Sequence, residues 1–203
     1  MAERKAHVER NTSETKIIVD LNLDGSGKYD IDTGIGFFDH MLNSFAKHGF
    51  FDLTCKVDGD LEVDCHHTIE DTGIVLGQAI REAVGDKKGI RRFGNFLLPM
   101  DETLVLGAVD LSGRPYCVCD LPFTVERVGG FDTEMVQEFF YAISYSAPMN
   151  LHLKFMHGSN NHHIMEAAFK AFAKVGDFTV YDRRNRDITY LFSVRLKQMF
   201  CLV

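Results

Sequence analysis

Two copies of the motif His-His-x-x-Glu are the part of this chain best suited to chemistry. The first copy runs from His66 to Glu70 and the second from His162 to Glu166. An apolar series with helical spacing follows each copy, so each motif is expected at the start of a helix. Imidazole and carboxylate groups suit manganese, iron, cobalt or zinc ions. Two such half-sites in one chain predict a two-metal centre.

The helical spacing suggests how each motif divides its ligands. His67 and Glu70 are three positions apart, and so are His163 and Glu166, so we expect each pair to converge on one ion. The histidine before each pair points about 100° away around the helix and is expected to serve a different ion. A solvent-exposed histidine pair is the ordinary explanation of a single copy, but two copies in a chain with nine histidines favour metal binding.

Composition and charge bound the class of protein. The chain has 203 residues, of which 45% are apolar and 25% charged, as expected of a globular protein with a sizeable core. A net charge of −7 argues against a nucleic-acid surface, although local arginines can still bind a small anion. There is no secretory h-region and no apolar run near the ~20 residues of a membrane span. Five cysteines without a C-x-x-C motif indicate reduced thiols, and hence a cytoplasmic protein.

The elements that must position the two motifs form a repeated series. In the first half we expect strands over 15–23, 29–33 and 52–57, a helix over 37–49, and a helix from the first motif to near Gly85. Residues 29–33 are expected to return as the hairpin partner of 15–23. In the second half we expect strands over 93–100, 103–111, 116–123 and 150–156, a helix over 132–146, and the second motif helix.

The repeated order predicts an internal duplication in an α+β protein. We expect two similar halves, each a roughly four-stranded sheet with two helices on one face. The boundaries place the first half at 1–89, the second at 90–176 and a divergent tail at 177–203.

The duplication adds one ligand candidate to each half. His40 lies twelve residues before Asp52, and Glu138 lies twelve before Asn150. The full candidate set is His40, His66, His67, Glu70, Glu138, His162, His163 and Glu166. Eight groups shared by two ions give four protein ligands each, which leaves open positions on a six-coordinate ion and favours catalysis over a structural site.

Longer stretches of the chain resemble one enzyme family. Residues 34–42, 64–74, 99–103 and 161–167 are similar to the signatures of imidazoleglycerol-phosphate dehydratase, an enzyme of histidine biosynthesis, and the resemblance covers roughly residues 4–174. It implies two Mn²⁺ ions per active site, trimers assembled into a hollow 24-mer, and metal sites between subunits. In that arrangement the ligands of the first half, His40 included, would meet Glu138 and the second motif of a neighbouring chain.

The resemblance also implies a reaction. The family removes water from D-erythro-imidazole glycerol phosphate to give imidazole acetol phosphate, and metal ions on the imidazole ring act as Lewis acids that let the ring accept electrons. Glu14 matches the family's general base, which the sequence alone would leave as an exposed glutamate. His40, His67, Glu70 and Glu166 are expected to take part in catalysis through the metals.

Several residues match the family's substrate contacts. Arg92 and Arg114 match contacts to the substrate phosphate, for which guanidinium groups are well suited. His48 and Lys170 match further substrate contacts. After about Lys174 the resemblance ends, because the family's Ile-Pro-Ser-Thr-Lys-Gly segment has no counterpart. Ser193 and Lys197 lie at a different spacing, so no phosphate contact is assigned to them.

Three functions fit the predicted metal centre. The dehydratase requires an imidazole substrate and a base at Glu14. A di-metal hydrolase would use the same ligands to activate water and would cleave esters or amides without needing an imidazole. A non-catalytic metal-binding assembly would bind ions without turnover.

Overall fold

The computed structural model describes residues 4–88 and 90–179. Of the expected tail over 177–203, the part from residue 180 on, with Ser193 and Lys197, lies outside the described residues.

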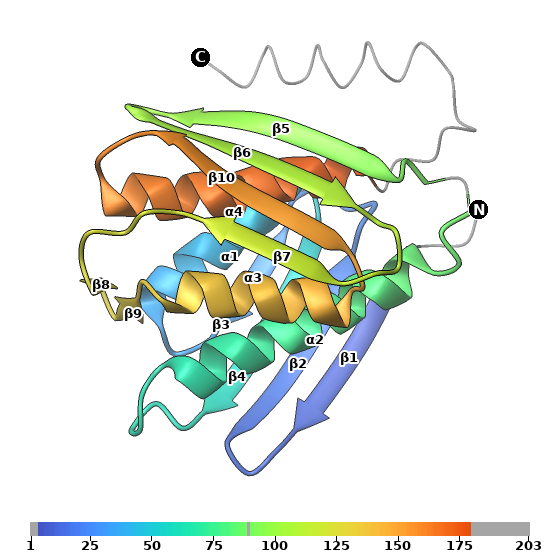
Figure 1. Cartoon of the computed structure of the whole chain (residues 1–203). Coiled ribbons are helices and arrows are strands. Elements are labelled where there is room, and N and C mark those ends of the chain that lie inside the picture. The colour runs from blue at the N-terminus through green and yellow to red at the C-terminus, as the bar shows by residue number, and fades with distance from the viewer. Residues whose placement is uncertain (1–3, 89, 180–203) are drawn as a thin grey trace.

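Two four-stranded sheets and four long helices make up the described chain (Figure 1). The first half comprises β1 (Lys5–Asn11), β2 (Thr15–Asn22), β3 (Tyr29–Asp32), α1 (Gly36–Gly49), β4 (Asp52–Gly59) and α2 (His66–Val84). The second half comprises β5 (Phe93–Met100), β6 (Thr103–Asp110), β7 (Tyr116–Asp120), α3 (Met135–Ser146), β10 (Asn150–His157) and α4 (Asn161–Thr179). A small ribbon of β8 (Arg127–Val128) and β9 (Phe131–Asp132) precedes α3.

The two sheets have the same topology. Their strand orders are β1-β2-β4-β3 and β5-β6-β10-β7. In each sheet the first two pairs are antiparallel and the last pair is parallel. An ion pair repeats at the parallel edge of both sheets, Lys56 with Asp30 and Lys154 with Asp120. The expectation of two similar α+β halves is therefore confirmed, whereas the residue boundaries of the halves stay a prediction.

The four helices lie between the two sheets and pair across the halves (Figure 1). Helix α1 packs against α4, and α2 packs against α3. A cluster of buried phenylalanines joins the halves: Phe139 lies against Phe38 and Phe169, with ring centroids 5.2 Å and 5.1 Å away. Since the halves share this core, each motif helix is positioned by the other half of the chain.

Glycines allow α2 and α3 to approach closely. A Cβ atom added at Gly73 would lie 2.8 Å from the carbonyl oxygen of Phe139, and one at Gly77 would lie 2.9 Å from that of Ile143. Both distances are too short for a real Cβ, so larger residues at either glycine would push the helices apart. Glu138, next to Phe139, is therefore held on the helix that packs against α2.

Some expected elements differ from the structure. Residues 29–33 do form a strand, but β3 pairs parallel with β4 and is not a hairpin partner of β2. The helix expected from Asp132 begins at Met135, because Asp132 lies in β9 and pairs with Arg127. Strand β1 was not anticipated, since its sequence is largely charged and Val8 is its one buried residue.

Within residues 4–88 and 90–179, no helix combines the length and the apolar character needed to span a bilayer.

Candidate metal centre

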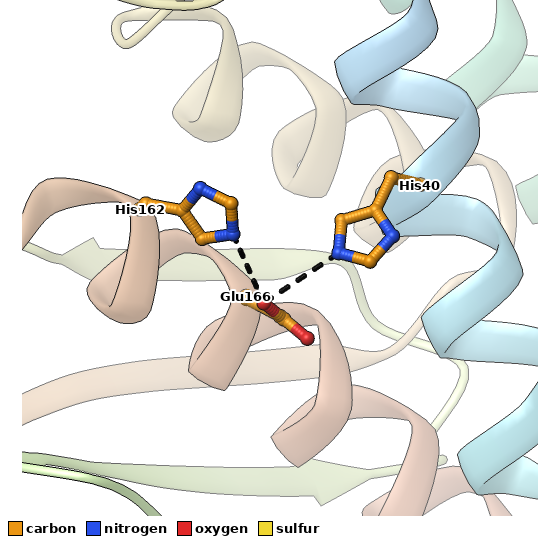
Figure 2. Close-up of side chains that lie close together, drawn as sticks. All are labelled: His40, His162 and Glu166. Atoms are coloured by element: carbon orange, nitrogen blue, oxygen red, sulfur yellow. Dashed lines mark hydrogen bonds and ion pairs between the residues drawn. The ribbon is translucent and has the colours of Figure 1, made fainter.

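His40, His162 and Glu166 meet at the contact between α1 and α4 (Figure 2). Glu166 Oε2 lies 3.1 Å from His162 Nε2 and 3.6 Å from His40 Nε2. One ligand atom from each of the three side chains lies within 4.8 Å of the other two, and no other such group of three occurs in the part of the chain that the structure describes. The three residues come from both halves of the chain.

This geometry fits a divalent ion. Two ligand atoms about 2.1 Å from an ion and at right angles to each other lie about 3 Å apart, and tetrahedral angles widen that separation to about 3.4 Å. The two distances above are close to these values. Two imidazoles and one carboxylate are also the donor set that transition-metal ions prefer. The residues therefore fit a metal ion that takes its remaining ligands from elsewhere.

Glu166 is held in its ionised form. Its side chain is only 8% exposed, and this burial by itself acts to raise the pKa of the carboxyl group. The hydrogen bond and charge of Lys170, whose Nζ lies 2.7 Å from Oε1, together with His40 and His162, outweigh burial and lower the pKa of Glu166. The carboxylate is thus available as a ligand at neutral pH.

Local structure positions both motifs at helix starts. The backbone N–H groups of His162 and His163 donate to Asn160 Oδ1 at 2.9 Å and 3.3 Å. In the first half the N–H of His66 donates to Asp64 Oδ1 at 2.7 Å. Asp and Asn side chains commonly accept these otherwise unpaired N–H groups, so each motif begins its helix two residues after such a residue.

The expected pairing within each motif was wrong. His66, not His67, lies beside Glu70, with Nε2 and Oε2 3.5 Å apart. His162, not His163, likewise lies beside Glu166. A residue four positions along a helix is only about 40° around the axis, compared with about 60° for three positions, so the first histidine of each motif is closer to the glutamate.

The second histidine of each motif points to a carboxylate outside its own helix. His67 Nδ1 lies 2.9 Å from Asp60 Oδ2, and His163 Nδ1 lies 2.8 Å from Glu102 Oε2. The hydrogen bond to Asp60 raises the pKa of His67, and the negative charge of Glu14 adds to the effect. The reciprocal hydrogen bond from His163 holds the pKa of Glu102 well below its usual range.

The eight candidate ligands do not form one cluster within a single chain. His40 was expected to meet the second motif of a neighbouring chain, and this part of the expectation is wrong, because His40 meets His162 and Glu166 of its own chain. His66 and Glu70 form a second pair on α2, and half-buried Glu138 lies on α3, which packs against α2. The structure therefore brings His40, His162 and Glu166 together and pairs His66 with Glu70, while His67 and His163 lie beside other carboxylates.

Glu14 lies at the exposed tip between β1 and β2, near the first motif. Its carbonyl oxygen accepts a hydrogen bond from the N–H of Asp60 at 3.1 Å. The next residue, Thr15, donates its hydroxyl to buried Asp71 on α2 at 2.5 Å, and Asp71 also pairs with Arg10. The tip is therefore fastened to α2 while the Glu14 side chain stays exposed.

The candidate substrate contacts fall beside two different carboxylates. Lys170 pairs with Glu166, and its charge adds to burial in lowering the pKa of half-buried His48. Arg92 donates from Nε and Nη2 to Asp110 at 2.6 Å and 3.0 Å. Exposed Arg114 also acts on Asp110 electrostatically. His48 and Lys170 thus adjoin the cluster of His40, His162 and Glu166, whereas the arginines adjoin Asp110.

Sequence reasoning gave no role to Asp60 and Glu102. Glu102 stands 61 residues from His163 along the chain, and no short spacing connects them. Asp60 is one of several acidic residues near 58–64 and carries no distinguishing sequence signal. Glu102 lies within the signature stretch 99–103, but only the folded structure shows that it meets His163 and that Asp60 meets His67.

The chain is similar to known proteins over most of its length. The family model described as imidazoleglycerol-phosphate dehydratase matches residues 33–175. An imidazoleglycerol-phosphate dehydratase of Lachnoclostridium phytofermentans is 68% identical over 174 residues, which cover 86% of this chain and 89% of that protein. One from Acetivibrio thermocellus is 59% identical over 175 residues, covering 86% and 90%.

A solved structure agrees with these relatives. The crystal structure of the dehydratase from Staphylococcus aureus has a TM-score of 0.78 to this chain at 38% identity, covering 86% of this chain and 97% of the other. The family match ends at residue 175, one residue beyond Lys174, near which the resemblance was expected to end.

Proposed function

The chain belongs to the imidazoleglycerol-phosphate dehydratase family of hydro-lyases, which act in histidine biosynthesis, and from this premise we propose that two divalent metal ions, Mn²⁺ in each case, serve its dehydration reaction. The substrate is D-erythro-imidazole glycerol phosphate and the product is imidazole acetol phosphate. Membership of this family favours the dehydratase over a di-metal hydrolase or a non-catalytic metal-binding assembly.

The cluster of His40, His162 and Glu166 is the observation that carries the metal proposal. These side chains supply three ligand atoms at separations that suit one ion. The ionised state of Glu166 and the adjoining Lys170 support the same reading. A substrate held at this ion would adjoin His48 and Lys170.

The internal symmetry supports a second ion at the other helix pair. Glu138 is the counterpart of His40, and His66 and Glu70 are the counterparts of His162 and Glu166. The close contact between α2 and α3 at Gly73 supports the placement of Glu138 on this ion. A carboxylate in place of an imidazole makes this second centre more negative than the first.

His67 and His163 remain as ligands for other copies of the chain. Each lies at the start of its motif helix with a partly exposed side chain, and neither belongs to the cluster of His40, His162 and Glu166. We infer that each completes a centre of a neighbouring copy, in a homo-oligomer that we take to be the family's 24-mer of trimers. Active sites then lie between subunits, and metal binding stabilises the assembly.

The chain's own residues carry out the remaining parts of the reaction. Bound metal ions supply Lewis acidity to the substrate's imidazole ring. Glu14 takes the carbon-bound proton, for which its exposed and fastened position is suited. His48, Lys170, Arg92 and Arg114 bind the substrate, and the two arginines do so by charge pairing with its phosphate.

We also propose that the enzyme works in the cytoplasm without nucleic-acid or membrane partners. The four cysteines in the described residues, Cys55, Cys65, Cys117 and Cys119, are all free thiols, which suits a reducing compartment.

A dehydration assay tests the metal proposal. The protein is stripped with a chelator, reloaded with Mn²⁺, and mixed with imidazole glycerol phosphate while the ketone product is followed. We expect no turnover by the stripped protein and full recovery on reloading, with two ions bound per chain. Turnover by a protein shown to contain no metal would overturn the proposal. Hydrolysis of the phosphate ester without ketone formation would favour the hydrolase.

A further inference from the structure

Each motif's second histidine makes the same contact through the same atom. His67 Nδ1 lies 2.9 Å from Asp60 Oδ2, and His163 Nδ1 lies 2.8 Å from Glu102 Oε2. An ionised carboxylate can only accept a hydrogen bond, so each imidazole must carry its proton on Nδ1. The lone pair of the neutral ring then lies on Nε2, the atom that can bind a metal ion, and His163 Nε2 also lies 3.7 Å from Asp101 Oδ2.

Hydrogen bonds to both oxygens hold the Glu102 carboxylate in place. Its Oε2 contacts His163, while Oε1 accepts hydrogen bonds from the N–H groups of Ser159 at 3.2 Å and Asn160 at 2.9 Å. Asn160 in turn accepts the N–H groups that begin α4. The carboxylate therefore joins the turn between β5 and β6 to the start of α4, and its position fixes the plane of the His163 ring.

Asp60 makes the matching contact in the first half, and its backbone also contacts Glu14. Its Oδ2 contacts His67, and its backbone N–H donates to the carbonyl of Glu14. Its Oδ1 is buried without a hydrogen-bond partner in the described structure. Burial of the unpaired Oδ1 atom costs free energy. The hydrogen bond between Oδ2 and His67 offsets part of that cost.

The strand register shows that the two halves supply this contact from different places. Asn22 pairs with Asp52 in the first sheet, and Asp110 pairs with Asn150 in the second. Counting back along β2 and β6 from these pairs makes Thr15 the counterpart of Thr103, and hence Glu14 the counterpart of Glu102. Counted forward along β4 and β10, with the register shift between Phe155 and His157 included, Gly158 is the counterpart of Gly59 and Ser159 is the counterpart of Asp60.

The residue types explain the difference. Ser159 stands at the position of Asp60 and has no carboxylate, so in the second half Glu102 supplies it instead. In the first half Asp60 occupies that role, which leaves Glu14 without this contact and free to serve as a base.

We propose that Asp60 and Glu102 are positioning residues that fix the Nδ1–H tautomer of His67 and His163 and so present Nε2 to the metal ions. The inference rests on the proposed metal dependence and adds two residues to the site. Both act through their histidine and contact no substrate.

Metal affinity is the readout that tests this role. Mn²⁺ binding to the full chain is measured by calorimetry for the unchanged protein and for Glu102→Gln and Asp60→Asn, variants that keep side-chain shape and remove the charge. Loss of such partners weakens metal binding about 10–100-fold, and we expect a loss in this range for each variant. Co²⁺ absorption spectra should change as well, because the imidazole orientation changes. Asp58→Asn and Glu126→Gln, at exposed carboxylates, are the matched controls and should bind like the unchanged protein.

A double-mutant cycle separates positioning from a general structural effect. In a His163→Asn background, Glu102→Gln should cause no further loss of affinity, because the residue acts only through that imidazole. Additive losses would overturn the inference, as would affinities within twofold of the unchanged protein for both folded variants. Absence of Mn²⁺ binding by the unchanged protein would instead overturn the proposed function and this inference with it. The two variants lie in different halves, so misfolding of one leaves the other as a test.

Discussion

His40 Nε2 lies 3.6 Å from Glu166 Oε2, although the two residues belong to different halves of the chain (Figure 2). The contact depends on the packing of α1 against α4. Helices α2 and α3 pack together in the same way, with the pair of His66 and Glu70 on α2 and Glu138 on α3. Neither candidate centre can form in an isolated half, because each takes its helices from both.

Removing a ligand from the first centre should reduce metal content. We expect His40→Asn to lose about one of two bound ions per chain and to lower kcat/KM by at least about 100-fold. Loss of a residue that only hydrogen-bonds to a metal ligand already costs about 10–100-fold in metal affinity or activity, and loss of the ligand itself should cost more. Metal analysis of the purified protein and a steady-state assay check this. His152→Asn, at an exposed histidine on β10, is the control and should keep both ions. Full metal content in His40→Asn would contradict the assignment.

The base can be separated from the metal ligands. Glu14→Gln should lower kcat by about 10²–10⁴-fold, the usual contribution of a general base, while the metal content stays unchanged. Glu9→Gln, at an exposed strand residue, should have little effect. Turnover unaffected by Glu14→Gln would remove the base assignment and leave the metal centre intact.

The close contact between α2 and α3 should be sensitive to one methyl group. Gly77→Ala places a Cβ 2.7 Å from Ser146 Cβ and 2.9 Å from the carbonyl oxygen of Ile143. Overpacking of this kind costs about 1–3 kcal/mol, which exceeds the stabilisation that alanine normally gives a helix. Denaturant unfolding measures the difference. Gly36→Ala, where nothing lies within 4 Å, should be neutral or stabilising.

His48 should make stability depend on pH. Burial and the charge of Lys170 lower the pKa of His48 below 6.5, so the folded state favours its neutral form. The resulting stability is present above the unfolded pKa and is lost as pH falls through the lower folded pKa. The slope is at most about 1.4 kcal/mol per pH unit, and less for a half-exposed group.

A comparison of two variants tests this sign. We expect thermal unfolding of the metal-free protein between pH 7.5 and 5 to show a weaker pH dependence for His48→Gln than for the unchanged protein. His152→Gln should retain the original dependence. A steeper dependence in His48→Gln would contradict the direction of the shift.

Removing the ions should weaken the assembly as well as the activity. A ligand that binds only the folded protein adds about 2.7 kcal/mol at 100 times its dissociation constant. We therefore expect a chelator to lower the Tm of the unchanged protein and to reduce its oligomer size in ultracentrifugation. A chelator effect of equal size on a variant lacking His40 and His66 would argue that the change has another cause.

Periodicity and duplication predicted most of the fold because they depend on local burial. The alternation of Ile17, Val19 and Leu21 is that of β2, and the apolar series after each motif is that of α2 and α4. The partner of β3 could not be predicted in this way. Its choice between β2 and β4 depends on the path of the chain through 23–28, which periodicity does not describe.

The ligand types were evident in the sequence, but their grouping was not. Spacing allowed either histidine of a motif to pair with the glutamate, and side-chain direction on the helix decided for the first. The meeting of His40 with Glu166 depends on helix packing between the halves. Glu102 lies 61 residues from His163, and Asp60 lies in the loop before the first motif, so the folded structure was needed to recognise their contacts.

The equivalence of Glu14 and Glu102 has a consequence for how asymmetric chemistry arises in a duplicated protein. An assembly of two copies of one shorter chain would carry two identical glutamates, and a substitution in that chain would change both. Once both halves share one chain, a substitution can affect a single copy. In the function and positioning role proposed above, Glu14 accepts a proton from carbon while Glu102 supports a ligand, so a symmetric scaffold distinguishes the two ends of an unsymmetrical molecule.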